Sequence, residues 1–145
     1  MITKTDIKRF LKEDAPKGDA TCRAFPALQS DLCEFEFISK SAYPFILCGA
    51  KVVEDILNVI NAGSFHITRF KEDGEKIKMG EKILKGKAKI SDFLLAERLS
   101  LNIIQHLSGI ATNTSAFVAT LNDPKIKILD TRKTLPGLRK IQKYA

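Results

Sequence analysis

The sequence predicts a mixed α+β fold, because segments with helical periodicity and segments with strand periodicity alternate along the chain. Residues 4–14, 50–62 and 92–121 carry apolar side chains at helical spacing, whereas residues 33–38 alternate between polar and apolar. The length of 145 residues fits one domain or one and a half. With 44% hydrophobic and 28% charged residues, the composition excludes a disordered or collagen-like chain.

The N-terminal third predicts one helix followed by two strands. In 4–14, Ile7, Phe10 and Leu11 share a face, and Thr3 or Thr5 can act as the N-cap. Residues 17–21 follow as a turn or loop. The alternation in 33–38 predicts a strand with both phenylalanines on one face, and a second strand is expected at 45–48.

The middle of the chain predicts a helix and a small β-meander. The helix spans about 50–62, with Gly63 as C-cap, and its buried face comprises Val52, Val53, Ile56, Leu57 and Ile60. Short strands separated by glycines fill 65–90 around a turn at Asp73-Gly74. This pattern also resembles the hairpin of lipoyl-type carrier domains, but no lysine stands out as a modification site.

Residues 92–121 carry the strongest helical signal, with apolar residues recurring every four positions from Leu95. Because glycine disfavours helix interiors, we expect Gly109 to kink or break the run, leaving a second helix at 110–121. A strand is predicted at 125–130 and a helix at 138–145, the order that begins a βα repeat.

The charge balance favours anionic partners. The chain has 24 Lys and Arg against 17 Asp and Glu, a net charge of +7. Basic residues are spread and poorly interleaved with aromatic ones, so no motif for nucleic acid emerges. No apolar run could cross a bilayer or form a signal core, and the three cysteines form no CxxC pair. We therefore expect no membrane span, no disulfide or zinc site, and a cytoplasmic location.

The most informative polar stretch is Asp130-Thr131-Arg132-Lys133-Thr134, directly after the predicted strand. Parallel-sheet enzymes bind ligands at the carboxyl ends of their strands. Arg132 offers a planar fork for a carboxylate or phosphate, and Lys133 offers a point charge. Adjacent side chains on an extended backbone point to opposite faces, so the two cations would reach different parts of a ligand, or only one would enter the site. From the residues alone, a solvated basic loop is an equal interpretation.

The other candidates have ordinary structural explanations. Arg98 lies on the polar stripe of the long helix, where an exposed face with an intrahelical or capping pair is the simpler interpretation. His106 shares that stripe and is expected to pack or hydrogen-bond at an interface, since no metal-ligand spacing surrounds it. His66 is expected to be structural, and Asp14 and Asp19 to be cap or turn residues.

Several motifs together resemble quinolinate phosphoribosyltransferase. These are residues 13–21 (Glu-Asp-Ala-Pro-Lys-Gly-Asp-Ala-Thr), 97–102 (Glu-Arg-Leu-Ser-Leu-Asn), 107–112 (Leu-Ser-Gly-Ile-Ala-Thr), 129–139 (Leu-Asp-Thr-Arg-Lys-Thr-Leu-Pro-Gly-Leu-Arg) and 142–145 (Gln-Lys-Tyr-Ala). The resemblance implies an N-terminal α/β sandwich domain over residues 1–110. It implies the first strand and helix of a truncated α/β barrel over 111–145.

The resemblance also implies a reaction. Enzymes of this family join quinolinate to phosphoribosyl pyrophosphate, releasing pyrophosphate and carbon dioxide and giving nicotinate mononucleotide for NAD synthesis. Mg²⁺ accompanies the pyrophosphate substrate, and the enzyme is a homodimer. Arg98 matches an arginine that reaches quinolinate in the partner's site, Arg132 one that clamps a quinolinate carboxylate, and Thr131 and Lys133 residues that line the pocket. These are substrate clamps, and no catalytic nucleophile or metal ligand is expected in this stretch.

Two alternatives stay open at this point. A ModD-like molybdenum-transport-associated homologue shares the Glu13–Asp19 turn, and a non-catalytic module that binds anions or nucleic acid would fit the positive charge. The resembling family is roughly twice this length, because a barrel adds about 250 residues or fewer. We therefore expect a fragment that does not turn over on its own.

Overall fold

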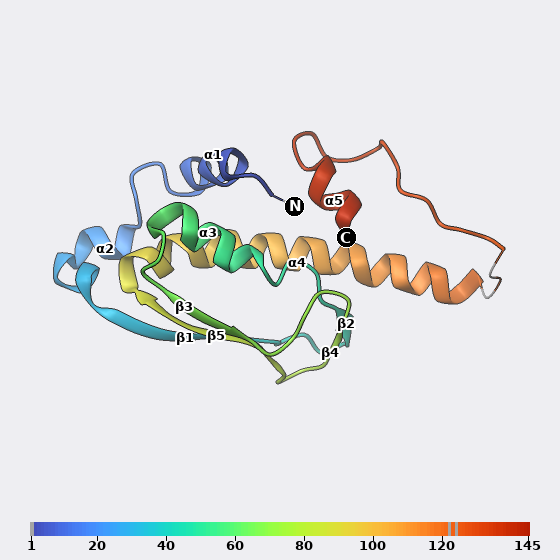
Figure 1. Ribbon diagram of the computed structural model, residues 1–145, viewed down its shortest axis with the longest axis horizontal. Coiled ribbons are helices and arrows are strands. Elements are labelled where there is room, and N and C mark those ends of the chain that lie inside the picture. The colour runs from blue at the N-terminus through green and yellow to red at the C-terminus, as the bar shows by residue number, and fades with distance from the viewer. Residues whose placement is uncertain (1, 122, 124) are drawn as a thin grey trace.

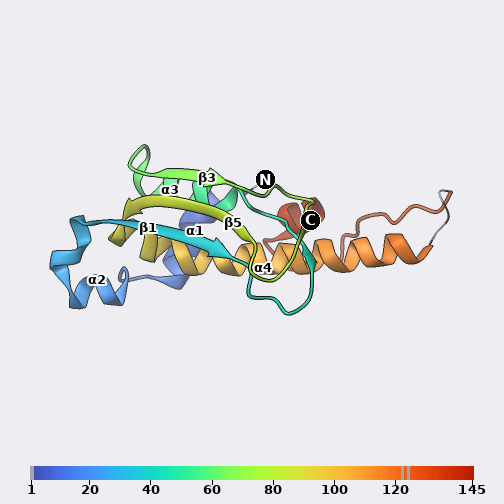
Figure 2. The ribbon, with the colours of Figure 1, turned by 90° about the horizontal axis from the view of Figure 1, so that it is seen from below.

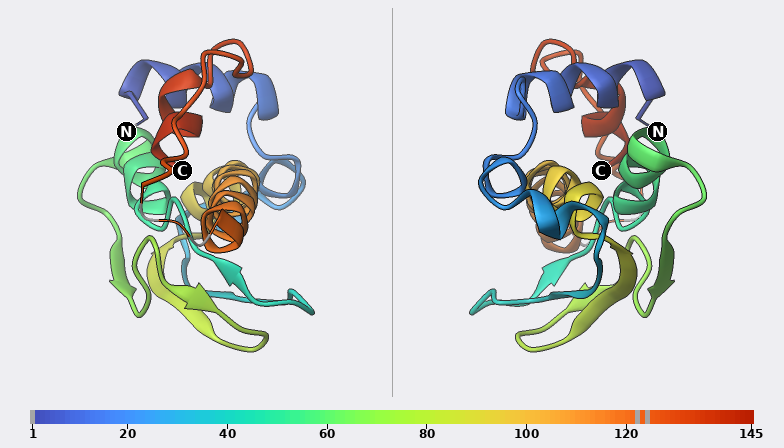
Figure 3. Two further views of the ribbon diagram at one scale, coloured as in Figure 1. Left: turned by 90° about the vertical axis from the view of Figure 1, so that its right-hand side faces the viewer. Right: turned by 90° about the vertical axis from the view of Figure 1, so that its left-hand side faces the viewer.

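The computed structural model describes residues 2–121, 123 and 125–145, and it confirms the mixed α+β class. Along the chain the elements are α1 (Lys4–Asp14), α2 (Ala20–Ala24), the 3-10 helix η1 (Pro26–Ser30), β1 (Leu32–Ile38), β2 (Phe45–Ile46), α3 (Val52–Asn61), β3 (His66–Arg69), β4 (Lys76–Ile77), β5 (Lys82–Lys89), α4 (Ile90–Leu121) and α5 (Arg139–Tyr144). The helices form two layers over one face of the larger sheet (Figure 3): α3 and α4 lie next to the sheet, and α1 and α5 lie beyond them.

The larger sheet has the strand order β1-β5-β3, and both pairings are antiparallel. Phe35 and Phe37 of β1 are buried on one face, as the alternation predicted. The Phe35 ring stacks on Phe93 of α4, with centroids 4.2 Å apart. Gly86 on β5 pairs with Phe35 and provides the space that this ring needs. The other face of the sheet is exposed, and it carries the charged residues Glu34, Glu36, Lys85 and Lys87 together with exposed Leu32 and Ile38.

Helices α3 and α4 pack against each other in the centre of the molecule (Figure 1), and their apolar faces supply much of the core. Val53, Ile56 and Leu57 of α3 are almost fully buried, and Leu107 of α4 is 1% exposed. Helix α1 begins with a capping box in which the Thr3 hydroxyl accepts the Asp6 N–H. The predicted helices at 4–14 and 50–62 are therefore confirmed, although α3 ends at Asn61 with Ala62 as its C-cap.

The predicted break at Gly109 is wrong, because α4 runs without interruption from Ile90 to Leu121. Tertiary contacts on both sides of the glycine outweigh its unfavourable propensity of about 1 kcal/mol. The Ser108 hydroxyl accepts the Cys48 N–H at 3.0 Å, and the Thr112 hydroxyl accepts the Ile46 N–H at 2.9 Å. These bonds join α4 to β2 and to the residues just after it, and β2 pairs with β4 in the smaller sheet. The predicted domain boundary after residue 110 falls inside α4 and stays a prediction.

The predicted strand at 125–130 is also wrong. Its described residues have no regular secondary structure, and Ile126, Ile128 and Leu129 are exposed. A strand needs a neighbour to pair its N–H and C=O groups, and no described strand pairs with this segment. Instead, the chain returns from the far end of α4 toward α5, as Figures 1 and 2 show. Helix α5 confirms the helix predicted at 138–145.

Two short helices follow α1: α2 begins inside the turn or loop expected at 17–21, and η1 lies in a stretch for which the sequence made no prediction. Asp19 caps α2 by accepting the Cys22 N–H at 2.8 Å, and Pro26 begins η1. All three cysteines are free. Among the described residues, no helix is both long and apolar enough to cross a membrane.

Candidate functional site

The loop that carries Arg132 and Lys133 lies between α5 and residues 125–130, which have no regular secondary structure. The Thr131 hydroxyl accepts the Lys133 N–H at 3.1 Å and thereby closes a local turn. Arg139 of α5 donates from Nε to the Thr134 hydroxyl at 3.1 Å and from Nη2 to the Arg132 carbonyl at 3.3 Å. The backbone of the loop is thus held by the helix that follows it, while the Arg132 side chain is exposed.

Two further contacts from α5 hold the ends of this loop. Lys143 Nζ lies 2.7 Å from Asp130 Oδ2, and Gln142 Oε1 accepts the Leu135 N–H at 2.9 Å. Residues 139, 142 and 143 share a face because they lie three and four positions apart on a helix. Sequence reasoning missed Arg139 and Gln142 as loop-holding residues, and this spacing was the available signal.

Thr131 and Lys133 line a cavity of about 460 Å³ between the loop, α5 and α4. Its remaining wall comprises Ile110, Thr114, Ile128, Leu129, Asp130, Thr134, Gln142, Lys143, Tyr144 and Ala145. Arg132 is not among the lining residues. This placement agrees with the expectation that adjacent side chains on an extended backbone diverge, so only one of the two cations enters this cavity.

Arg98 lies elsewhere on the molecule, on the exposed side of α4. Its Nη1 is 3.4 Å from Asp14 Oδ1 at the end of α1, and its side chain is 67% exposed. An ion pair this open to water contributes about 1 kcal/mol or less. The side chain is exposed as expected, but the pair is not intrahelical: it joins α4 to the end of α1, and Asp14 is an ion-pair partner as well as a helix-end residue. Arg98 does not line the cavity that holds Thr131 and Lys133.

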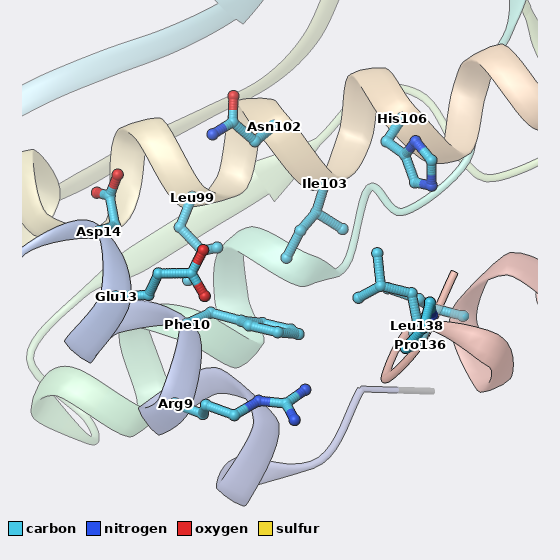
Figure 4. Close-up of a pocket in the computed structure, with 11 residues that line it drawn as sticks. Arg9, Phe10, Glu13, Asp14, Leu99, Asn102, Ile103, His106, Pro136 and Leu138 are labelled. Atoms are coloured by element: carbon cyan, nitrogen blue, oxygen red, sulfur yellow. The ribbon is translucent and has the colours of Figure 1, made fainter. Parts of the chain in front are cut away.

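A larger cavity, of about 740 Å³, lies between α1, α4 and the segment that leads into α5 (Figure 4). Arg9, Glu13 and Asp14 of α1 and Asn102 and His106 of α4 line it, and Pro136 and Leu138 lie at one end. His106 Nε2 lies 2.8 Å from Gln142 Nε2. The expectation that His106 hydrogen-bonds at an interface is confirmed, and the interface is the one between α4 and α5.

Asp73 joins three parts of the fold, although the sequence suggested only a turn residue. Its Oδ1 accepts the Ala50 N–H ahead of α3, and its Oδ2 accepts the Tyr144 hydroxyl, each at 2.8 Å. The hydrogen bond to this carboxylate, together with partial burial and negative charge, raises the pKa of Tyr144 to about 12. The end of α5 is therefore fixed to the turn before β4.

The described residues hold no group of three or more His, Cys, Asp or Glu side chains that could bind a metal ion. Asp130, the carboxylate nearest the cationic loop in sequence, is already paired with Lys143. This stretch of chain therefore does not fit Mg²⁺ on its own.

Comparison with known proteins places these features in a family. Residues 19–108 match the family described as quinolinate phosphoribosyl transferase, N-terminal domain, and residues 110–145 match its C-terminal domain. A probable nicotinate-nucleotide pyrophosphorylase (carboxylating) of Bacillus subtilis is 40% identical over 96% of this chain and 46% of its own length. The nicotinate-nucleotide pyrophosphorylase (carboxylating) of Mycobacterium leprae is 42% identical over 96% of this chain and 49% of its own.

Solved structures agree with these matches. The crystal structure of nicotinate-nucleotide pyrophosphorylase from Ehrlichia chaffeensis is 33% identical, with a TM-score of 0.86 over 99% of this chain and 51% of that one. The crystal structure of NadC from Streptococcus pyogenes is 31% identical, with a TM-score of 0.85 over 95% and 49%. The chain therefore spans about half the length of the curated relatives it matches. On the evidence of its sequence matches and its fold, the chain belongs to the quinolinate phosphoribosyl transferase family.

Proposed function

We propose that this chain supplies part of an enzyme that transfers a phosphoribosyl group to quinolinate, with loss of pyrophosphate and carbon dioxide, to give nicotinate mononucleotide for NAD synthesis. The single observation that carries the proposal is the loop of Thr131, Arg132 and Lys133. Its backbone is fixed by Arg139, and its cationic side chains remain exposed. The names of the Bacillus and Mycobacterium relatives support the reaction.

The chemistry of this reaction suits the residues present. Both substrates are polyanions, and a site that stabilises developing negative charge needs fixed cations more than a nucleophile. Arg132 can hold a carboxylate through two parallel hydrogen bonds, and Lys133 can hold a second anionic group. The Thr131 hydroxyl holds the loop turn and lines the same cavity as Lys133.

Arg98 is proposed to act on the substrate bound by a second copy of the chain in a homodimer. Two observations support this assignment. Arg98 lies outside the cavity of Thr131 and Lys133, and its exposed pair with Asp14 costs little to break. A second copy would bring a cation to the carboxylates of a quinolinate held at Arg132.

Two further parts of the proposal concern the metal ion and the activity of these 145 residues on their own. Mg²⁺ is assigned to the phosphoribosyl pyrophosphate substrate, since the described residues do not form a metal site by themselves. We also propose that these 145 residues alone do not turn over. They span about half the length of the relatives and carry only a few of the cations that the two polyanions require.

Quinolinate binding to the chain tests the proposal. In titration calorimetry, Arg132→Gln should weaken binding by about 10- to 100-fold, because a charge-assisted hydrogen bond contributes about 1.5–3 kcal/mol. The control is Arg23→Gln, an exposed arginine on α2 with the same loss of charge. Nicotinate, which lacks one carboxylate, should bind more weakly than quinolinate.

Two results would contradict the assignment. One is failure of the wild-type chain to bind quinolinate. The other is equal weakening of quinolinate binding by Arg132→Gln and Arg23→Gln, as expected for nonspecific attraction to a basic protein. The role of Arg98 is tested by Arg98→Gln, which should weaken binding only at protein concentrations where sedimentation shows a dimer.

A further inference from the structure

We infer that His106 is a positioning residue for the cationic loop, acting through Gln142, and that its ring is neutral with Nε2 unprotonated. The inference rests on the proposed function, because that function gives the loop its role. It adds a residue that belongs to α4, the same helix that carries Arg98.

The first step is the contact between Gln142 and the loop. Gln142 Oε1 lies 2.9 Å from the Leu135 nitrogen and accepts its N–H. Leu135 directly follows the segment Thr131–Thr134, so this bond fixes the backbone at the end of the cationic loop. A backbone N–H can only donate, and it therefore determines which end of the Gln142 amide faces the loop.

The second step follows from the first. Because Oε1 faces Leu135, the amide nitrogen faces His106, and Nε2 of one side chain lies 2.8 Å from Nε2 of the other. An amide NH₂ group has only hydrogens to offer, so the imidazole nitrogen opposite it must accept. The His106 Nε2 therefore carries no proton, and the ring is neutral with its hydrogen on Nδ1.

The third step concerns what the pair accomplishes in the fold. Gln142 is half-buried on a six-residue helix, and a helix this short has little stability of its own. Ile141 anchors α5 through apolar packing, which resists separation but is not directional. The bond from His106 adds direction, since it selects the rotamer of Gln142 that reaches Leu135. His106 thus connects α4 to the loop through two hydrogen bonds in series.

The groups facing this pair are mixed in charge. Arg9, Glu13 and Asp14 of α1 line the same cavity as His106, and Lys140 and Lys143 lie on α5. Among the described residues, none of these side chains hydrogen-bonds to His106 or Gln142. The orientation of Gln142 is therefore assigned to His106 and Leu135.

The test uses the 145-residue chain and its two histidines. Nitrogen-15 NMR of the imidazole rings should show His106 with an unprotonated Nε2 and a protonated Nδ1. The variant His106→Phe should speed amide hydrogen exchange at Leu135 and weaken quinolinate binding by about three- to tenfold, the range expected for one net hydrogen bond. The variant His106→Gln should restore both, because its Oε1 can accept from the Gln142 amide. The matched control is His66→Phe on β3, which should change neither.

The outcomes separate this inference from the proposed function. A His106 ring protonated on Nε2, or Leu135 exchange that is unchanged in His106→Phe, would overturn the positioning role whether or not quinolinate binds. If the wild-type chain does not bind quinolinate, the proposed function is wrong. The His106 tautomer and amide exchange at Leu135 would still show whether His106 positions Gln142. Thermal unfolding of each variant checks that the fold is kept, and a fold lost in His106→Phe but kept in His106→Gln still supports the hydrogen bond.

Discussion

Replacing Gly86 with alanine should destabilise the fold strongly for such a small change. A Cβ built at Gly86 would lie 2.4 Å from Cζ of Phe35 and 2.8 Å from the carbonyl oxygen of His66. Neither atom can move easily, because the Phe35 ring stacks on Phe93 and the His66 backbone belongs to β3, which pairs with β5. Overpacking of this kind costs about 1–3 kcal/mol. With backbone on one side, we expect about 2–3 kcal/mol, or a melting temperature lower by about 6–10 °C.

A matched substitution on α4 should have the opposite sign. A Cβ at Gly109 meets nothing within 4 Å, and the residue lies in the interior of a continuous helix. Alanine there removes the glycine propensity cost and should stabilise the chain by about 0.8–1 kcal/mol.

Urea unfolding of the two variants, followed by circular dichroism, gives both changes in the free energy of unfolding. If Gly86→Ala is as stable as wild type, the close packing of Phe35 against β5 is wrong. If Gly109→Ala destabilises a chain that sedimentation shows to be monomeric, the open surroundings of that glycine are wrong.

Two further predictions concern ionisable groups. The hydrogen bond to Asp73 raises the pKa of Tyr144 to about 12, so the folded state holds this proton more tightly than the unfolded state. The free energy of unfolding should therefore fall as pH rises from about 10 to 12. Urea unfolding at different pH values should show a smaller fall in Tyr144→Phe. At low pH the relevant group is Asp6, whose pKa is lowered mainly by the Thr3 hydroxyl. Because Thr3 also caps α1, Thr3→Ala should lower the free energy of unfolding by about 0.5–2 kcal/mol at neutral pH. The difference between Thr3→Ala and wild type should shrink as pH falls through the lowered pKa of Asp6, and a constant difference would contradict the capping box.

The elements that could be predicted from the sequence are those whose pattern is local and repeated. Alternation at Phe35 and Phe37 identified the buried face of β1, and the four-residue spacing from Leu95 identified α4. Helix α2 was missed because five residues are too few for periodicity. Its one signal, the cap at Asp19, is equally typical of a turn.

The two wrong predictions have physical reasons. Glycine propensity at position 109 is worth about 1 kcal/mol. On either side of it, the hydroxyls of Ser108 and Thr112 bind the backbone of Cys48 and Ile46, and these contacts cannot be seen from the helix sequence alone. The apolar alternation at 125–130 is a genuine strand pattern, but a strand forms only where another strand accepts its hydrogen bonds.

For the candidate site, the residue types in 131–133 were enough to single out the loop, because two adjacent cations flanked by threonines suit an anion. The long-range contacts that fix α5 behind the loop could not be found in the same way. Asp73 lies 71 residues from Tyr144 in the chain, and His106 lies 36 residues from Gln142. Contacts of that separation depend on the tertiary fold and leave no local pattern.

Because α4 is continuous, the direction in which each of its side chains points depends on how many residues separate it from a fixed point of the helix. Each residue added to a helix turns everything beyond it by about 100° and advances it by 1.5 Å. The Ser108 and Thr112 hydroxyls fix the rotation of the helix against the backbone of Cys48 and Ile46. One residue inserted between His106 and Ser108 would therefore rotate His106 and Arg98 together away from their present partners. Seven inserted residues would bring both back to within about 20° of their original direction, although about two turns farther along the axis.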